Sequence, residues 1–221
     1  MSVVAIVDMG IGNLRSVEKA IERASDEARV AWQALITSDP DVVARADKVV
    51  VPGQGAFRDC AAALGPGPGG LGGAVRSQID RGTPFLGICL GLQALFESSE
   101  ESPGSAGLAL FAGTNVRLPD GRRDEVTGEA LKIPHMGWNR IELSGDAHPY
   151  LVAAGGEGTY FYFTHSYHAV PGDLSLMAAT ARHGPMSITA AVARANVFAS
   201  QFHPEKSQAA GLRLLAAFLK S

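Results

Sequence analysis

The sequence predicts an α/β fold with a mixed, mostly parallel central sheet and helices on both faces. Short, nearly continuous apolar runs at residues 3–7, 48–51 and 83–86 have the composition of strands that are buried on both faces. Segments with helical spacing of apolar residues, at 14–24 and 72–81, separate these runs. Because strands that alternate with helices are joined by right-handed crossovers, we expect a parallel sheet between two helical layers.

Length and composition favour one globular domain over residues 1–221. With 46% hydrophobic and 19% charged residues, the chain has enough apolar side chains for a full core. The net charge is −3 and no block of like charges occurs, so the sequence does not indicate binding to nucleic acid or to an acidic membrane surface. No apolar run reaches the ~20 residues of a membrane span. Two cysteines are too few to stabilise a chain of this length by disulfides. Asp8 interrupts the first apolar run, so that we expect no secretory signal. Together these observations predict a cytoplasmic protein.

A turn with two glycines follows the first strand. Gly10 and Gly12 form the turn, and Asn13 is placed to cap the helix predicted over 14–24. A Gly-x-Gly turn also occurs in dinucleotide-binding fingerprints. Since Arg15 stands where the third glycine belongs, an ordinary strand-to-helix loop is favoured over phosphate binding.

The next segments repeat the strand and helix alternation. A second strand is expected near residues 30–36 and a third at 48–51, which leads into the glycine-rich loop 52–57. The Gly/Pro segment 65–70 predicts a surface connection. A helix over 72–81 then returns the chain to the strand at 83–86.

After Pro103 shorter strand-like runs follow, separated by turns, and we expect them to add antiparallel strands to the same sheet or beside it. The expected strands lie at residues 108–118, 131–133, 138–143, 160–163, 174–181, 187–193 and 197–201. The chain closes with a helix over 208–219, where the leucines form one apolar stripe.

A cysteine stands between the fourth buried strand and the helix predicted after it over 90–96. Gly87, Cys89 and Gly91 have the spacing of a nucleophile elbow, in which small flanking residues allow a strained turn that presents the central side chain. A thiol at the start of a helix is also favoured as thiolate by the positive end of the helix dipole. The alternative is a buried core cysteine, but a plain core strand gives the two glycines no role.

A histidine and a glutamate follow the last predicted strand. His203 lies just beyond that strand, and Glu205 projects to the same side if the chain stays extended through Pro204. At the end of a parallel strand they would lie beside Cys89, as base and orienting carboxylate. A His-Pro turn with a structural role is the alternative. Loop 52–57 would supply backbone N–H groups to the same site, which completes a nucleophile, base and oxyanion arrangement.

These motifs resemble those of the class I, triad-type glutamine amidotransferases. The segments 87–93 and 201–207 are shared across that family, and segments 10–17, 132–139 and 162–167 are similar to the members that serve imidazole glycerol phosphate synthase in histidine biosynthesis. The resemblance runs from residue 3 to the last helix. It implies a flavodoxin-like fold and a glutaminase that needs no metal and no cofactor.

The resemblance also implies roles for individual residues. Cys89 would attack the side-chain amide of L-glutamine, His203 would transfer protons, and Glu205 would orient the imidazole. The oxyanion would be held by the N–H of Leu90 and by one from Gly53 or Gln54, and Gln54 stands where relatives more often carry an apolar residue. The residues implied to hold the amino-acid end of glutamine are Gln93, Glu101, Ser166 and Tyr167. For Glu101 an exposed surface acid is the alternative, because it belongs to a small acidic cluster.

The ammonia released needs a second site, for which this chain is too short. The resemblance implies a (β/α)8-barrel cyclase on another protein, in a heterodimer. The candidates for the docking face are Asn13, Pro134, Met136, Trp138 and Asn139. Interface anchors are enriched in tryptophan, which favours Trp138, and its alternative is a core tryptophan in a strand.

Two other classes of function stay open from the sequence. A hydrolase of γ-glutamyl amides would use the same three residues without a partner. A binding protein with a catalytically inactive amidotransferase fold would have no need of Cys89, His203 and Glu205 together.

Overall fold

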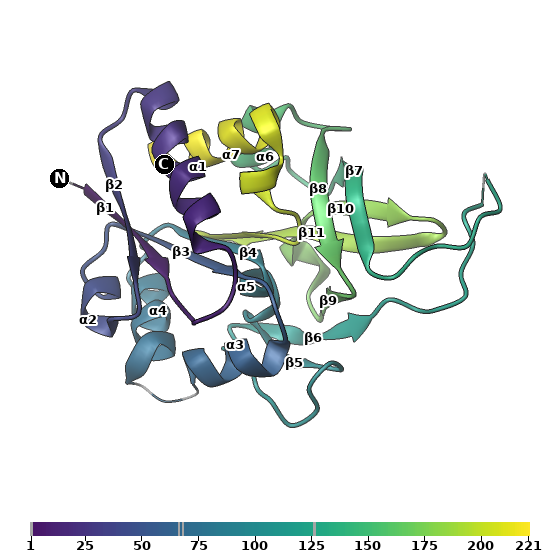
Figure 1. Cartoon of the computed structure of the whole chain (residues 1–221), viewed down its shortest axis with the longest axis horizontal. Helices are drawn as coiled ribbons and strands as arrows, with labels where there is room; N and C mark the ends of the chain where they lie inside the picture. Colours follow the sequence, from purple (N-terminus) through teal and green to yellow (C-terminus); the bar gives the residue numbers. More distant parts are fainter. Residues whose placement is uncertain (1, 66, 68, 126) are drawn as a thin grey trace.

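A nine-stranded mixed sheet runs through the molecule (Figure 1). The computed structural model describes residues 2–65, 67, 69–125 and 127–221. In order across the sheet, the strands are β2 (Trp32–Thr37), β1 (Ser2–Val7), β3 (Lys48–Gly53), β4 (Phe85–Cys89), β12 (Val197–Ser200), β11 (Met186–Arg194), β10 (Met177–His183), β7 (His135–Leu143) and β8 (Tyr160–His165). Neighbours from β2 to β12 pair in parallel, and neighbours from β12 to β8 pair antiparallel. The predicted mixed sheet is confirmed.

Successive residues of β1 point into two cores, one on each face of the sheet. Ile6 packs in one cluster with Val17, whereas Val7 packs in the other with Phe57 and Val75. The helices of the first face are α1 (Leu14–Ala28), α6 (Pro149–Ala154) and α7 (Gln208–Lys220). Those of the second face are α2 (Pro40–Val43), α3 (Phe57–Leu64) and α4 (Gly70–Asp80). Figure 1 shows these two layers above and below the sheet, which confirms the prediction of helices on both faces. Within the described part of the chain, no helix has the length and apolarity needed to cross a membrane.

Helix α1 begins where the sequence predicts. The side-chain oxygen of Asn13 accepts a hydrogen bond from the backbone N–H of Ser16 at 3.3 Å, so Asn13 caps the helix. The helix runs on to Ala28, beyond the predicted stripe, and ends at Arg29 in a left-handed conformation.

The helix predicted over 90–96 is wrong beyond its first turn. Helix α5 (Leu90–Gln93) is short, and the chain turns into strand β5 (Phe96–Ser99). This strand belongs to a second, three-stranded sheet with β6 (Phe111–Arg117) and β9 (Tyr167–Pro171). The carbonyl of Leu95 accepts hydrogen bonds from the N–H groups of Leu110 and Phe111, so pairing with a distant segment ends the helix.

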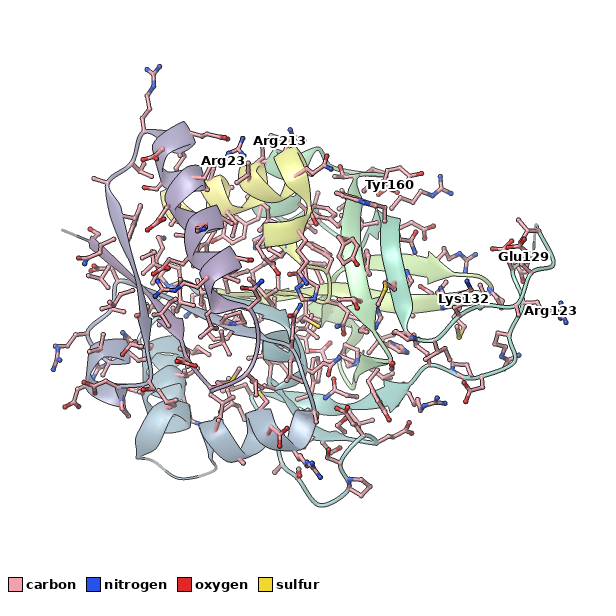
Figure 2. The ribbon with its side chains drawn as sticks, viewed as in Figure 1. Arg23, Arg123, Glu129, Lys132, Tyr160 and Arg213 are labelled. Carbon is pink, nitrogen blue, oxygen red and sulfur yellow. The ribbon has the colours of Figure 1, made fainter. Side chains whose placement is uncertain are left out.

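The strand predicted at 131–133 is also wrong. Residues 119–125 and 127–134 belong to an extension from the sheet, and Figure 2 shows Arg123, Glu129 and Lys132 on it. Its described residues hold one isolated bridge between Arg123 and Ala130. Leu131 instead lies against Gly184 at the tip of the β10–β11 hairpin, where a Cβ on that glycine would come 2.5 Å from its side chain. An apolar side chain therefore packs on the hairpin here without joining a strand ladder.

Other predicted boundaries differ from those of the structure. The strand predicted at 174–181 begins only at Met177, because Asp173 caps a 3₁₀ turn over Leu174–Leu176. The strand predicted at 108–118 is shortened to β6. Part of the predicted surface connection, at Pro66 and Pro68, lies outside the described residues. The elements that the sequence did not predict are α2, α3, α6, β5 and β9.

Candidate active site

The turn at Cys89 is a strained strand-to-helix elbow. Strand β4 ends at Cys89, which has φ 53° and ψ −102°, and α5 begins at the next residue. A non-glycine residue at positive φ is uncommon and costs about 1–3 kcal/mol, so the surrounding structure must hold it in place. Cys89 is 7% exposed and lines a cavity of about 490 Å³. Cys89 thus belongs to a buried core cluster, as the alternative expects, and also adjoins a cavity, as a nucleophile requires.

The two glycines beside Cys89 allow close packing against neighbouring strands. A Cβ on Gly91 would stand 1.8 Å from the carbonyl oxygen of Val51 in β3, which no side chain tolerates. A Cβ on Gly87 would stand 2.8 Å from the carbonyl oxygen of Gly91 and 2.9 Å from the Cβ of Ala199 in β12. Both strands that flank β4 thus depend on these glycines.

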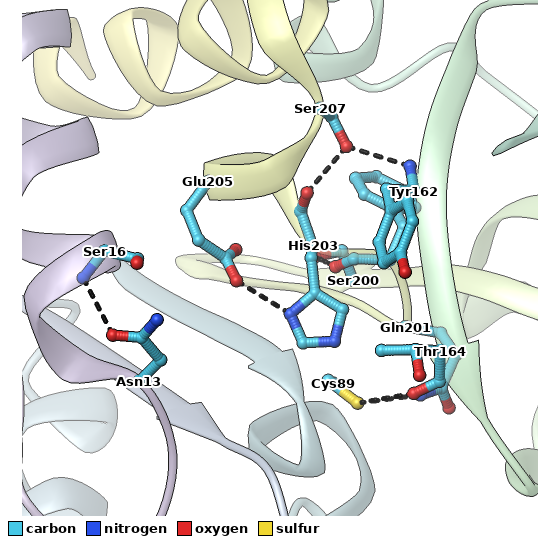
Figure 3. Close-up of polar contacts among 11 residues, drawn as sticks. Asn13, Ser16, Cys89, Tyr162, Thr164, Ser200, Gln201, His203, Glu205 and Ser207 are labelled. Carbon is cyan, nitrogen blue, oxygen red and sulfur yellow. Dashed lines mark hydrogen bonds and ion pairs between the residues drawn. The ribbon is translucent and has the colours of Figure 1, made fainter. Parts of the chain in front are cut away.

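The histidine that the sequence singled out lies between Cys89 and a carboxylate (Figure 3). His203 Nδ1 is 2.8 Å from Glu205 Oε1, and both side chains are buried. Pro204–Lys206 do not form the extended chain expected from the sequence but a 3₁₀ turn, which brings the carboxylate to the ring. The backbone of His203 is fixed as well: its N–H donates to the carbonyl of Tyr162, and its carbonyl accepts from the hydroxyl of Ser207 at 2.6 Å.

The charge on His203 is set by opposing effects. Burial alone lowers the pKa of His203, but the neighbouring Cys89 sulfur and the Glu205 carboxylate outweigh burial and raise the pKa to about 9. The imidazole is thus held as the cation at neutral pH. Its Nε2 atom has no hydrogen-bond partner among the described residues and remains available for proton transfer.

Two further groups contact the thiol. The side-chain amide nitrogen of Gln201 donates to Cys89 Sγ at 3.4 Å, and the carbonyl oxygen of Thr164 lies 4.0 Å from Sγ (Figure 3). Neither residue was predicted from the sequence as a site residue. Gln201 lies in the segment 201–207, two residues before His203, but nothing in its residue type indicated contact with the sulfur.

The loop expected to supply the oxyanion donor lies beside the elbow. The parallel register of β3 and β4 pairs Gly53 with Cys89. A Cβ on Gly53 would come 2.8 Å from the Cβ of Leu90, and a Cβ on Gly12 would come 3.2 Å from the backbone nitrogen of Gln54. The Gly53–Gln54 peptide therefore sits between the first turn of α5 and the turn before α1.

The predicted glutamine-binding residues gather around one cavity. Those that line it are Gln93, Glu101, Ser166 and Tyr167, together with Gln54 and Leu90 of the predicted oxyanion site. Lining residues that the sequence analysis did not name as site residues are Gly55, Tyr162, Thr164, His165 and Lys206. The structure thus assembles these segments, distant in sequence, at one opening.

Two of these residues are also engaged inside the protein. The amide nitrogen of Gln93 donates to the carbonyl of Tyr167 at 2.9 Å and to the side-chain oxygen of Gln201 at 3.1 Å. One carboxylate oxygen of Glu101 accepts a hydrogen bond of 2.7 Å from the N–H of Phe57, the first residue of α3. Because Glu101 both lines the cavity and holds a helix start, the alternative of a simple exposed acid is wrong.

Three of the residues predicted for docking lie in β7, on its two faces. Met136 and Trp138 are 63% and 46% exposed and lie on one face, so the alternative of a core tryptophan is wrong. Pro134, which is exposed, directly precedes the strand. The ring of Trp138 meets that of Tyr162 edge to face at 6.2 Å. Asn139 points to the opposite face, where its amide nitrogen donates to the carbonyl of Arg182 at 2.6 Å. The remaining docking candidate, Asn13, is exposed at the start of α1.

Two buried histidines lie next to each other at the cavity, which His165 lines. His135 Nδ1 lies 3.0 Å from His165 Nε2, and His165 Nδ1 lies 3.0 Å from the carbonyl oxygen of Tyr167. Burial, and then the nearby His183, lower the pKa of His135 to about 4, and burial holds the pKa of His165 well below its usual value. These rings are therefore neutral, unlike His203. Among the described residues no group of three His, Cys, Asp or Glu side chains is arranged to hold a metal ion.

Comparison with known proteins identifies the family. The family model for glutamine amidotransferase class-I matches residues 5–221. A protein of Methylococcus capsulatus named imidazole glycerol phosphate synthase subunit HisH is 51% identical over 220 residues, covering 100% of this chain and 97% of its own. A protein of the same name from Syntrophotalea carbinolica is 48% identical over 215 residues, covering 97% and 98%.

Solved structures share the fold at low sequence identity. The glutaminase domain of Trypanosoma brucei CTPS with bound acivicin has a TM-score of 0.67 at 16% identity, covering 100% of this chain and 95% of that one. PurLQS from Thermotoga maritima has a TM-score of 0.69 at 17% identity, covering 99% and 98%. With the elbow cysteine and the His203–Glu205 pair beside it, and with a family match that spans nearly the whole sequence, this chain belongs to the class I glutamine amidotransferases.

Proposed function

We propose that this chain hydrolyses L-glutamine at Cys89 and passes the ammonia to a (β/α)8-barrel cyclase subunit of imidazole glycerol phosphate synthase. The chain is a glutamine amidotransferase, and its full-length similarity to HisH subunits assigns it to that synthase in histidine biosynthesis. The observation that carries the proposed chemistry is the imidazole of His203 held between Glu205 and the cavity-lining Cys89. We also propose that residues 1–221 act as one cytoplasmic glutaminase domain.

The proposed reaction uses two proton transfers by His203. The Cys89 thiolate attacks the side-chain carbonyl carbon of glutamine, and a C–S bond forms while the oxygen takes the negative charge. The His203 imidazolium gives its Nε2 proton to the amide nitrogen as the C–N bond breaks, so that the nitrogen leaves as neutral ammonia and a thioester remains. Neutral His203 next takes a proton from water, which hydrolyses the thioester to glutamate and returns the thiolate. Glu205 holds Nδ1, so the same ring atom serves both steps.

The oxyanion and the amino-acid end of glutamine need separate groups. The N–H of Leu90 and one from the Gly53–Gln54 region are the proposed oxyanion donors, because both segments adjoin Cys89. Gln93, Glu101, Ser166 and Tyr167 are the proposed contacts for the amino-acid end. Both described hydrogen bonds of the Gln93 side-chain nitrogen go to groups of the protein itself. The side-chain oxygen of Gln93 is therefore the atom proposed to accept a hydrogen bond from the ammonium group of the substrate.

The proposed cyclase covers the exposed face of β7 and β8. Ammonia released to water at neutral pH becomes ammonium and is lost as a nucleophile, so the acceptor site must join the glutaminase cavity. Met136 both lines the cavity and stands on the exposed face with Trp138. Pro134 extends that face, and Asn13 and Asn139 are proposed at its margins. An exposed Trp and Met beside the opening are the type of anchor that interfaces favour.

The test is synthesis by the reconstituted complex with glutamine or with an ammonium salt as nitrogen source. Cys89→Ala is expected to lower the glutamine-dependent rate by about 10⁴-fold or more and to leave the ammonia-dependent rate unchanged. Cys60→Ser is the matched control and should keep both rates. Glutamine-dependent synthesis by the Cys89→Ala complex would contradict the proposal.

A second measurement separates this function from that of an independent hydrolase of γ-glutamyl amides. Glutamine hydrolysis is measured for the free chain, for the complex, and for the complex with the cyclase ligand. We expect the rate to rise at each step, since losing one oxyanion donor costs about 10²–10³ in rate and a bound partner can favour the competent loop conformation. Equal rates in all three would favour the independent hydrolase.

A further inference from the structure

The Gln201 side chain forms a hydrogen-bonded link between the nucleophile and the segment that receives the substrate. Gln201 directly follows β12 and is fully buried, and its backbone N–H donates to the carbonyl of Ala190 at 2.8 Å. Its amide nitrogen lies 3.4 Å from Cys89 Sγ. Its amide oxygen accepts from Gln93, which also donates to the carbonyl of Tyr167.

The direction of every bond in this link is fixed by chemistry. The carbonyl of Tyr167 can only accept, so Gln93 must turn its amide nitrogen toward it. The same nitrogen also donates to the Gln201 side chain, and only the amide oxygen of Gln201 can accept this hydrogen bond. The nitrogen end of Gln201 is therefore the end that faces the sulfur, and it can only donate. A donor at this distance interacts more strongly with thiolate than with thiol, because charge assists the bond.

The buried position of the amide gives a second reason for a specific role. A buried amide without partners costs free energy that an apolar side chain of similar size does not. The site nevertheless places an amide there, with its oxygen bonded to Gln93 and its nitrogen aimed at Cys89. The thiol also has an acceptor, the carbonyl of Thr164, on which its own proton can rest. The sulfur is thus supplied with one partner for each protonation state.

We propose that Gln201 is a further catalytic residue, which holds the Cys89 thiolate in position by donating a hydrogen bond to the sulfur. The effect of this hydrogen bond on catalysis rests on the proposed glutaminase function. When the C–S bond forms, negative charge leaves the sulfur for the substrate oxygen. When the thioester is hydrolysed, the C–S bond breaks and the sulfur again takes the electron pair. The Gln201 donor favours the sulfur as a leaving group in that step, and no atom of Gln201 is transferred.

The experiment follows alkylation of Cys89 by iodoacetamide from pH 5 to pH 10, read by mass spectrometry on the full chain. Gln201→Leu removes the donor at similar volume, and Gln201→Glu keeps the shape but presents an ionised oxygen. Both are expected to move the midpoint of the alkylation profile to higher pH by at least about 1 unit, since a hydrogen bond to a charged group is lost. If the leucine variant fails to fold, the glutamate variant carries the test.

Gln78→Leu is the matched control. Gln78 is also a buried amide: its nitrogen donates to the carbonyls of Val43 and Ala46, its oxygen accepts from the hydroxyl of Thr83, and it lies in α4. Its loss should lower stability and leave the alkylation midpoint unchanged. Midpoints in both Gln201 variants equal to that of the wild type would overturn the proposal. Because alkylation needs neither glutamine nor the partner, this result stands whether or not the complex hydrolyses glutamine.

Discussion

Cys60 lies in α3 within the core between the sheet and one helical layer, and Cys89 is the last residue of β4, at the edge of a cavity. Both side chains are buried. Cys60 has the sulfur of Met9 as a neighbour at 3.5 Å, and burial raises the pKa of its thiol to about 12. Cys89 has His203 and Gln201 beside it. We therefore propose that polar partners and an adjoining cavity, not the exposed fraction alone, make Cys89 the reactive thiol and Cys60 the inert one.

The largest effect expected from a single atom change is at the carboxylate that orients His203. Glu205→Gln keeps the shape of the side chain but removes the charge, so the imidazole loses its oriented, protonated state. We expect kcat for glutamine hydrolysis by the complex to fall by about 10³–10⁴-fold, with KM little changed. Glu129→Gln, in the exposed extension, is the control. Full activity in the Glu205→Gln complex would show that glutamine hydrolysis does not need the Glu205 carboxylate.

The elbow itself is tested at Gly91. Gly91→Ala puts a methyl group 1.8 Å from the carbonyl oxygen of Val51, so β3 and β4 must separate. We expect a loss of about 1–3 kcal/mol in the free energy of unfolding, measured in urea, together with loss of glutaminase activity. Gly69→Ala is the control, since a Cβ there meets nothing within 4 Å. A Gly91→Ala protein as stable and active as the wild type would show that the elbow tolerates displacement.

The charge on His203 predicts a dependence of stability on pH. The pKa of His203 is raised from 6.5 to about 9 in the folded chain, so protonation of His203 stabilises the fold. This contribution to the free energy of unfolding is full below pH 6.5 and is lost as the pH rises toward 9. The lowered pKa values of His135 and His165 act only below pH 6.5, and the raised pKa of Cys60 acts only above 9.

Urea unfolding at several pH values between 6.5 and 9 measures this effect. The wild type is expected to lose on the order of 1–3 kcal/mol across that window, and Glu205→Gln clearly less. A wild-type stability that stays constant from pH 6.5 to 9 would contradict the assignment of a cationic His203.

The smallest effect is expected at the other thiol. Cys60→Ala removes one buried sulfur atom from the core, so we expect a loss of roughly 1–2 kcal/mol in stability. Glutamine hydrolysis by the complex should stay at the wild-type rate. A large loss of activity in a folded Cys60→Ala protein would mean that the two thiols were assigned the wrong way round.

The parallel half of the sheet could be predicted because its strands are buried on both faces. The runs at 3–7 and 49–51 are apolar without interruption, and helix α1 between them keeps a clear apolar stripe. Strands β5 and β9 could not be predicted in this way. They mix polar and apolar residues, and their partners lie far away in the sequence. The end of α5 depends on the same distant pairing.

The candidate site divides in a similar way. Cys89 could be found from the glycines that its turn requires, and His203 and Glu205 from a short motif after a strand. Gln201 and Thr164 could not be identified as contacts of the sulfur, because their roles come from where the fold places a common side chain and a backbone carbonyl. Trp138 required the structure to show that its side chain lies on an exposed face of β7, a strand that has neighbours on both sides.

Labelling by an electrophilic chloroketone analogue of glutamine tests the difference between the two thiols most directly. The intact complex is incubated with the analogue, and the modified residue and its rate are determined by mass spectrometry. We predict modification of Cys89 alone, slowed by added glutamine and almost abolished in His203→Ala. Modification of Cys60 at a comparable rate, or labelling of Cys89 that glutamine does not slow, would contradict the assignment of the elbow as the glutamine site.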